Sequence, residues 1–103
     1  MVLIALSAPS FADISESDLG DLKGYTILGS YEVTGWRDPD MDGMEGSSFK
    51  GCKRNRVLIL DRHLEVICSD YGYVYAYRPT AVILSNGVSL KMVVEGHVFS
   101  IRQ

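Results

Sequence analysis

Four tyrosines occupy every second position of one short run, namely Tyr71, Tyr73, Tyr75 and Tyr77. Successive side chains of a β-strand point to opposite faces, so this spacing predicts a strand over Tyr71–Arg78 with all four phenols on one face. A phenol joins an apolar ring to a polar tip, so a row of phenols can stack on a sugar, a peptide or another protein. Two interpretations are open: the rings fill the core, with some hydroxyls at its rim, or they form an exposed platform.

Two other side chains are candidates for the same surface. Arg78 follows the last tyrosine and can close the surface by stacking on a ring or by forming a forked pair with a carboxylate. Trp36 stands beside Gly35 and either plugs one end of the fold or marks the rim of a binding site. The predicted binding residues are therefore Trp36, Tyr71, Tyr73, Tyr75, Tyr77 and Arg78.

Acidic residues alternate over positions 38–45, which read Asp-Pro-Asp-Met-Asp-Gly-Met-Glu. Carboxylates in this spacing can converge on one Ca²⁺, and the glycine allows the sharp turn. An EF-hand loop needs a glutamate at its twelfth position, where Phe49 stands, and no helices are predicted to flank the segment. Two interpretations remain: a solvated acidic turn, or a looser calcium loop that uses Asp38, Asp40, Asp42 and Glu45.

A basic run follows the acidic segment directly, with cations at Lys50, Lys53, Arg54 and Arg56. It either balances charge across the surface or docks a partner as one half of a bipolar patch. The net charge of −3 argues against a nucleic-acid partner, since nucleic-acid binders normally carry a strong basic excess. The sequence contains no Gly-x-Ser-x-Gly, His-Glu-x-x-His or phosphate-loop motif, so we predict a non-enzymatic protein with no cofactor apart from the calcium considered above.

The two cysteines, Cys52 and Cys68, are an even number in a small chain, which favours a disulfide and export. With a two-residue hairpin loop at 62–63, Cys68 faces Val57 rather than Cys52. Five extended residues span about 16 Å, whereas bridged Cα atoms lie within about 7 Å. A bridge therefore requires the chain after Gly51 to curl back, or Cys52 to lie on another strand beside Cys68. The alternative is two buried free thiols.

Alternating patterns and turn residues predict an all-β fold. We expect a long strand bent at Gly29, a loop over 35–48, and hairpins at Asp61–His63, Asn86-Gly87 and Glu95-Gly96. In the last two hairpins Leu84 should face Ser89 and Met92 should face Phe99. The predicted strands are Tyr25–Thr34, Arg54–Leu60, Leu64–Cys68, Tyr71–Arg78, Ala81–Ser85, Val88–Val94 and His97–Ile101. The predicted fold is a small antiparallel meander barrel of about six strands, with a two-sheet sandwich as the alternative.

The beginning of the chain resembles the end of a secretory signal. An apolar stretch leads into small residues, and Ser10 and Ala12 match the small-x-small rule for cleavage before Asp13. We therefore expect residues 1–12 to be a signal remnant and residues 13–103 to form one all-β domain that is periplasmic or secreted. The alternative is an N-terminal strand, Val2–Leu6, that belongs to the fold. No stretch approaches the ~20 apolar residues of a membrane-spanning helix.

The C-terminal half carries a resemblance. The Phe-x-Gly-Cys run ending at Cys52, together with the Cys-x-x-Tyr-x-Tyr-x-Tyr-x-Tyr-Arg-Pro run that begins at Cys68, is similar to small exported bacterial proteins of uncharacterised function. Size, strand pattern and the cysteine pair also resemble periplasmic lysozyme inhibitors of barrel type, at the level of fold alone. We predict an exported binding module that contacts an unidentified protein or glycan through the aromatic strand and the acidic loop. The alternatives are a calcium-stabilised structural envelope protein and a periplasmic enzyme inhibitor.

Overall fold

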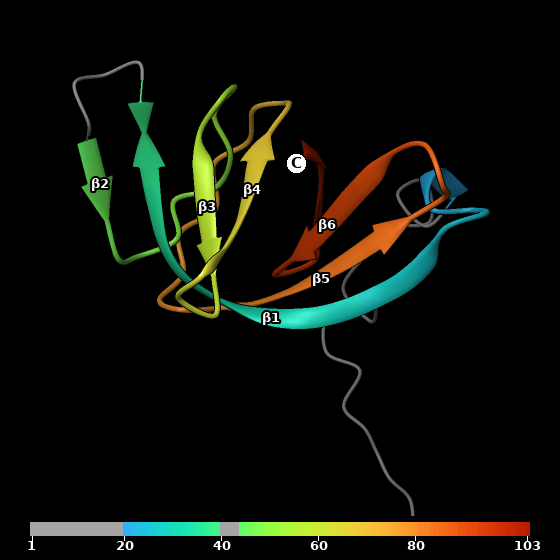
Figure 1. Ribbon diagram of the computed structural model, residues 1–103, viewed down its shortest axis with the longest axis horizontal. Helices are drawn as coiled ribbons and strands as arrows, with labels where there is room; N and C mark the ends of the chain where they lie inside the picture. The colour runs from blue at the N-terminus through green and yellow to red at the C-terminus, as the bar shows by residue number, and fades with distance from the viewer. Residues whose placement is uncertain (1–19, 40–43) are drawn as a thin grey trace, which may run out of the picture.

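The computed structural model describes residues 20–39 and 44–103, and these residues form a closed antiparallel β-barrel (Figure 1). Six strands close the barrel in the order β1-β3-β4-β7-β6-β5 and back to β1, while β2 pairs with β1 outside the ring. The prediction of a small all-β barrel is therefore confirmed. Apart from β1, its strands form a β3–β4 hairpin and a β5–β6–β7 meander. The strands are β1 Thr26–Asp38, β2 Met44–Gly46, β3 Val57–Leu60, β4 Leu64–Cys68, β5 Thr80–Ser85, β6 Leu90–Val94 and β7 His97–Arg102.

Strand β1 joins the β3–β4 hairpin to the β5–β6–β7 meander. Figure 1 shows it as a long curved strand, which pairs with β5 over residues 26–32 and with β3 over residues 33–37. The register shifts between Ile27 and Gly29 and again between Val33 and Gly35. Such irregularities bend a strand and increase its twist, which lets one strand serve both halves of the barrel. The first shift lies at Gly29, where the sequence predicted the bend.

The predicted loop over 35–48 is wrong in part. Strand β1 continues to Asp38, and β2 pairs back onto it through Trp36 opposite Gly46 and Asp38 opposite Met44. A full side chain at Gly46 would meet the indole of Trp36, so glycine permits this close approach. Residues 40–43, between β1 and β2 in the sequence, lie outside the described residues.

The turn residues predicted the register of one hairpin in the β5–β6–β7 meander correctly and that of the other wrongly. At Glu95-Gly96 the register is confirmed, with Met92 opposite Phe99. At Asn86-Gly87 it is wrong by two positions, because Leu84 pairs with Lys91 rather than with Ser89. The side chain of Asn86 accepts hydrogen bonds from the backbone N–H groups of Val88 and Ser89, at 2.9 and 2.7 Å. This Asx-type turn widens the loop to four residues.

The hairpin between β3 and β4 has a three-residue loop rather than the predicted two-residue loop. Leu60 pairs with Leu64, and Asp61 and Arg62 adopt φ values of 50° and 69°. Asp61 is also tied to β1, since its backbone N–H donates to the carbonyl of Glu32 and its carboxylate accepts from the N–H of Glu32. The three-residue loop therefore makes a tertiary contact with β1, and the residues of the turn alone did not predict the length of this loop.

The barrel interior is filled by one face of each strand. Its core includes Val33, Trp36, Phe49, Cys52, Leu58, Leu60, Val66, Cys68, Ala81, Ile83, Met92, Val94, Phe99 and Ile101. Phe49 belongs to none of the seven strands, yet it is fully buried and meets Phe99 edge to face at 6.1 Å between ring centroids. The segment before β3 therefore contributes to the core of the barrel.

Candidate functional site

The tyrosine run is an extended ribbon rather than a regular strand. It pairs with residues 49–52 through two isolated bridges, Phe49 with Ala76 and Cys52 with Gly72. At each bridge the two residues exchange both backbone hydrogen bonds, at 2.8–3.0 Å. The two bridges are three residues apart on one segment, from Phe49 to Cys52, but four residues apart on the other, from Gly72 to Ala76. This mismatch is an irregularity in the pairing, and it keeps the two segments from forming a continuous ladder.

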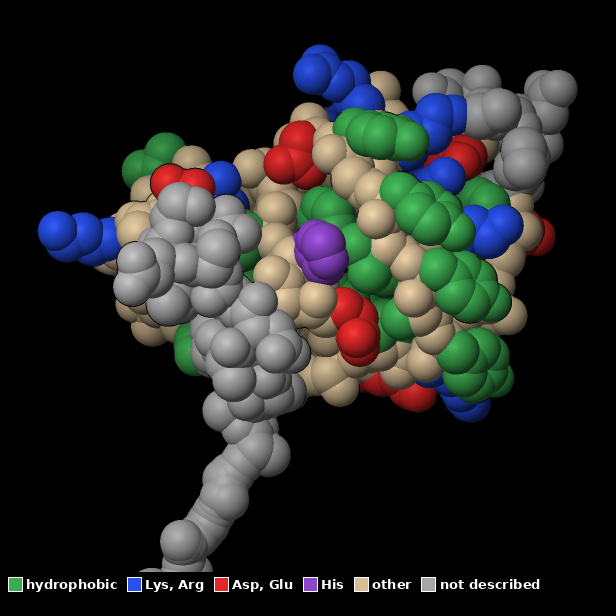
Figure 2. Space-filling view, turned by 180° about the vertical axis from the view of Figure 1, so that it is seen from behind, with side chains coloured by type: hydrophobic (Ala, Val, Ile, Leu, Met, Phe, Trp, Pro, Cys, Tyr) green, Lys and Arg blue, Asp and Glu red, His purple; other side chains and the backbone are tan. Residues whose placement is uncertain are grey.

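The predicted alternation of faces is present, and the tyrosines point outward. Tyr71, Tyr73, Tyr75 and Tyr77 are 77, 67, 59 and 70% exposed, so the rings form a surface and not a core. The residues between them face inward: Val74 packs against the barrel core, and Gly72 lies so close to Phe99 that a Cβ atom would meet its ring at 2.8 Å. Figure 2 shows a row of large hydrophobic side chains along one side of the molecule, with Lys and Arg side chains beside it. We call the four tyrosines the tyrosine face.

A glycine makes the ribbon possible. Gly51 has a φ of +86°, and a Cβ atom there would overlap the carbonyl oxygen of Gly72 in the facing segment. Left-handed backbone favours glycine because other residues bring Cβ too close to the backbone. The turn at Gly51 thus lets the chain curl back while it stays in contact with the tyrosine run.

Gly51→Ala is expected to destabilise the protein by more than the matched variant Gly24→Ala. Both glycines have nearly the same φ, +86° and +87°, but nothing lies within 4 Å of a Cβ atom at Gly24. The shared backbone strain costs about 1–2 kcal/mol, and only Gly51→Ala adds a clash with backbone atoms. Urea unfolding of both variants measures the difference. Equal losses of unfolding free energy would show that the ribbon yields to a Cβ atom at Gly51 without cost.

Beside the tyrosine face lies a hollow of about 320 Å³ with a cationic lining. Its walls combine part of the basic run with the first two tyrosines: Lys50, Cys52, Lys53, Arg56, Tyr71, Gly72 and Tyr73. The fold thus brings together a basic run and an aromatic run that lie apart in the sequence. Cations beside exposed rings suit a partner that offers an anionic group and an apolar or sugar surface.

Trp36 is a core residue and does not line this hollow. Its side chain is 4% exposed and belongs to the core. The guanidinium of Arg56 lies over the indole at 4.5 Å from the ring centroid, and the ammonium of Lys50 lies at 5.7 Å. Of the two interpretations of Trp36, the structure therefore favours a plug, and Trp36 reaches the site through the two cations that it supports.

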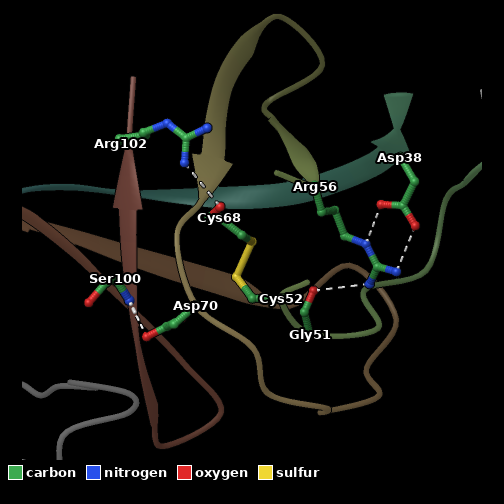
Figure 3. The surroundings of a disulfide bond; sticks show 8 residues. All are labelled: Asp38, Gly51, Cys52, Arg56, Cys68, Asp70, Ser100 and Arg102. Atoms are coloured by element: carbon green, nitrogen blue, oxygen red, sulfur yellow. Dashed lines mark hydrogen bonds and ion pairs between the residues drawn. A yellow bond between two sulfur atoms is a disulfide. The ribbon is translucent and has the colours of Figure 1, made fainter. Parts of the chain in front are cut away.

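Asp38 and Arg56 form a buried, two-pronged ion pair (Figure 3). The guanidinium donates to both carboxylate oxygens, at 2.7 and 2.9 Å, and a third hydrogen bond joins it to the carbonyl of Gly51 at 3.3 Å. The Asp38 side chain is 3% exposed and that of Arg56 11%. The hydrogen bonds from Arg56 lower the pKa of Asp38 against the opposing effect of burial. The pair anchors the end of β1 to the segment that carries the hollow.

This pair bears on the predicted calcium ligands. Asp38 would have to release Arg56 before its oxygens could bind a cation, whereas Glu45 is exposed on β2. Asp40 and Asp42 lie outside the described residues. Within residues 20–39 and 44–103, no three His, Cys, Asp or Glu side chains gather closely enough to hold a metal ion. A calcium loop therefore stays a prediction.

The predicted Cys52–Cys68 disulfide is present, with 5.5 Å between the Cα atoms (Figure 3). The chain does curl back between Cys52 and β3: the N–H of Arg56 donates to the carbonyl of Lys53, and Asn55 adopts a φ of 73°. The carbonyl of Cys68 accepts from the N–H of Asn55, and its N–H donates to the carbonyl of Arg56. The predicted placement of Cys68 opposite Val57 is wrong, because the three-residue loop of the β3–β4 hairpin puts Ile67 opposite Val57. The bridge fastens the ribbon that carries the tyrosine face to the barrel.

Arg78 closes the far end of the tyrosine face. Its guanidinium lies 5.8 Å from the ring centroid of Tyr77 and 3.9 Å from a carboxylate oxygen of Glu32 on β1. Arg78 therefore lies over the last ring, as one of its two suggested roles requires, whereas its contact with Glu32 is a single ion pair and not the suggested fork.

Comparisons with protein-family models, with curated proteins and with solved structures found no match. No helix in the described part of the chain is long and apolar enough to cross a membrane. The tyrosine face and the cationic hollow are the features of the molecule that bear on its function.

Proposed function

We propose that the protein is a non-enzymatic binding module that contacts a protein or a glycan through the tyrosine face. The observation that carries this proposal is the exposure of four tyrosines in one row, each at 59% or more. Large aromatic side chains are rarely gathered on a surface that contacts only water, and such patches mark interaction sites. Tyrosine suits this task because its two side-chain torsions cost little entropy to fix on binding.

The surroundings of the rings support the same proposal. The cationic hollow lies at one end of the row, and Arg78 lies at the other. The rings are held by a ribbon whose inward residues pack on the core and whose partner segment carries a disulfide. A surface that is fixed before binding loses less entropy when it binds.

Export is part of the proposal. The disulfide supports it, because disulfides persist in oxidising compartments such as the periplasm or the cell exterior. The expected signal remnant, residues 1–12, lies outside the described residues. An exported module with a preformed aromatic surface fits a role in contacting envelope glycans or other exported proteins.

Replacing Tyr73 and Tyr75 together by alanine is expected to weaken binding strongly while leaving the fold intact. Both side chains are mostly exposed, so their loss removes little buried area, whereas loss of an aromatic anchor from an interface costs about 2 kcal/mol or more. Two probe sets give the measurement: an array of immobilised glycans and a displayed library of random linear peptides. At 2 kcal/mol the affinity for a selected probe falls by roughly thirtyfold.

The control variant is Val88→Ala, which removes an exposed apolar side chain (94% exposed) in the β5–β6 loop. This variant should bind like the wild type, since Val88 belongs to neither the ribbon nor the hollow. The proposal fails if neither probe set yields a ligand, or if the tyrosine variant binds every selected ligand as tightly as the control does.

A further inference from the structure

The tyrosine ribbon has one paired edge and one free edge. Its paired edge consists of the backbone groups of Gly72 and Ala76, which bond to Cys52 and Phe49. Along an extended chain, the backbone N–H and C=O groups of neighbouring residues point to opposite sides. Those of Tyr71, Tyr73 and Tyr75 therefore point away from residues 49–52.

The free edge lacks partners throughout the described part of the chain. No backbone or side-chain hydrogen bond reaches the N–H or C=O groups of Tyr71, Tyr73 and Tyr75, and the only polar contact of these residues is from the Tyr75 hydroxyl to Ser48 at 3.4 Å. All three residues are exposed as a whole. The edge thus presents alternating donors and acceptors at the spacing of a β-strand.

Two of the usual protections of an edge strand are missing from residues 71–77. Proteins block free edges with charged side chains, prolines or a covering loop. From Tyr71 to Tyr77 the run contains no charge and no proline; Asp70 precedes the run, and Arg78 and Pro79 follow it. An unprotected edge of this kind is a template for another extended chain.

We propose that an extended polypeptide segment of a partner protein pairs with the free edge at Tyr71–Tyr75 and adds a strand to the ribbon. This inference rests on the proposed binding function and names its partner. The backbone of an extended peptide repeats the donor and acceptor pattern that the edge leaves open. Every second side chain of the added strand would lie beside the tyrosine rings, at cross-strand distances that favour aromatic and β-branched residues.

Peptides selected from a displayed library of random linear peptides provide the probe. Hydrogen exchange by NMR then measures the backbone amides of the full chain with and without the selected peptide. The amides of Tyr73 and Tyr75 should exchange at least about tenfold more slowly in the complex, because they gain partners. The amides of Gly72 and Ala76 already have partners and serve as internal controls, with changes under about twofold.

N-methylation of the selected peptide tests the same contact from the other side. Methyl groups on alternate amides in the register that faces the ribbon should lower affinity at least tenfold. Methyl groups on the intervening amides should leave it within about twofold, since those amides point to solvent.

The outcomes separate edge pairing from the broader binding function. Unchanged exchange at Tyr73 and Tyr75, or equal effects of N-methylation in both registers, would overturn edge pairing while tyrosine-dependent peptide binding kept the binding function. Selection of glycans alone, lost in the Tyr73→Ala/Tyr75→Ala variant, would likewise overturn edge pairing and keep the binding function. Failure of both probe sets would remove both proposals.

Discussion

Replacing Cys52 and Cys68 together by alanine is expected to lower the free energy of unfolding by about 3 kcal/mol. The two residues are 16 positions apart, and a bridge that closes a loop of this length contributes roughly that amount by restricting the unfolded chain. Both side chains are also buried, so the variant loses packing in the core. Each kcal/mol shifts the melting temperature of a domain of this size by about 4–8 °C, so a fall of roughly 12–24 °C is expected.

Urea unfolding and thermal melting, each with and without reductant, give the measurement and its control. Reductant should destabilise the wild type to nearly the level of the double variant and should leave the variant unchanged. A double variant as stable as the oxidised wild type would mean that the turn over residues 53–56 holds the ribbon without the bridge.

Arg56→Met is expected to lower the free energy of unfolding by about 3–5 kcal/mol at neutral pH, the range measured when one partner of a buried ion pair is removed. The substitution would leave the Asp38 carboxylate buried without its two hydrogen bonds, and it would remove the cation that lies over Trp36. The matched control is Arg54→Met in the same segment. Arg54 is exposed, so its replacement should change stability by about 0.5 kcal/mol or less.

The cost of Arg56→Met should shrink as the pH falls from 7 to 4. In the wild type, Arg56 lowers the pKa of Asp38, so the pair's contribution is complete above the unfolded pKa of about 3.9 and is lost only as the pH falls through the lower folded value. In the variant, burial raises the pKa of Asp38 and only the charge of Lys53 opposes it, so the carboxyl group takes up a proton in mild acid and the buried charge disappears.

Urea unfolding of both proteins at pH 7 and pH 4 follows this dependence. The variant Asp38→Asn/Arg56→Met, which carries no buried charge at this place, should recover part of the stability at pH 7 and lose the pH dependence. A deficit of Arg56→Met that is the same at both pH values would show that loss of packing on Trp36, and not the unpaired carboxylate, causes the destabilisation.

The parts of the fold that the sequence predicts are those controlled by local chemistry. Period-two patterns placed most strands, and Glu95-Gly96 set the right register because both residues accept a positive φ, 51° and 79°. The register failed at Asn86, where a side-chain amide widened the turn. The predicted register was also wrong at Asp61, because Asp61 bonds to β1 and such contacts between residues far apart in sequence do not appear in a local pattern.

For the candidate site, the sequence predicted the alternation of the tyrosines but not which face is outside. Both faces of the run are apolar, so hydrophobicity could not decide between them. What decides is space: Gly72 lies against Phe99, where no larger side chain fits. The Asp38–Arg56 pair and the cationic hollow were missed because they form between an expected loop and an expected strand, although the adjoining acidic and basic runs were a signal for such pairing.

Because β1 pairs with both β3 and β5, it also shapes the order in which the barrel can fold. The β3–β4 and β5–β6–β7 hairpins join near neighbours in sequence, and their turns close short loops. Pairing of Thr26 with Ser85 must instead close a loop that contains most of the chain. Contacts between residues far apart in sequence slow folding, so we expect the barrel to fold slowly for its size and the joining of β1 to β5 to cost the most loop-closure entropy.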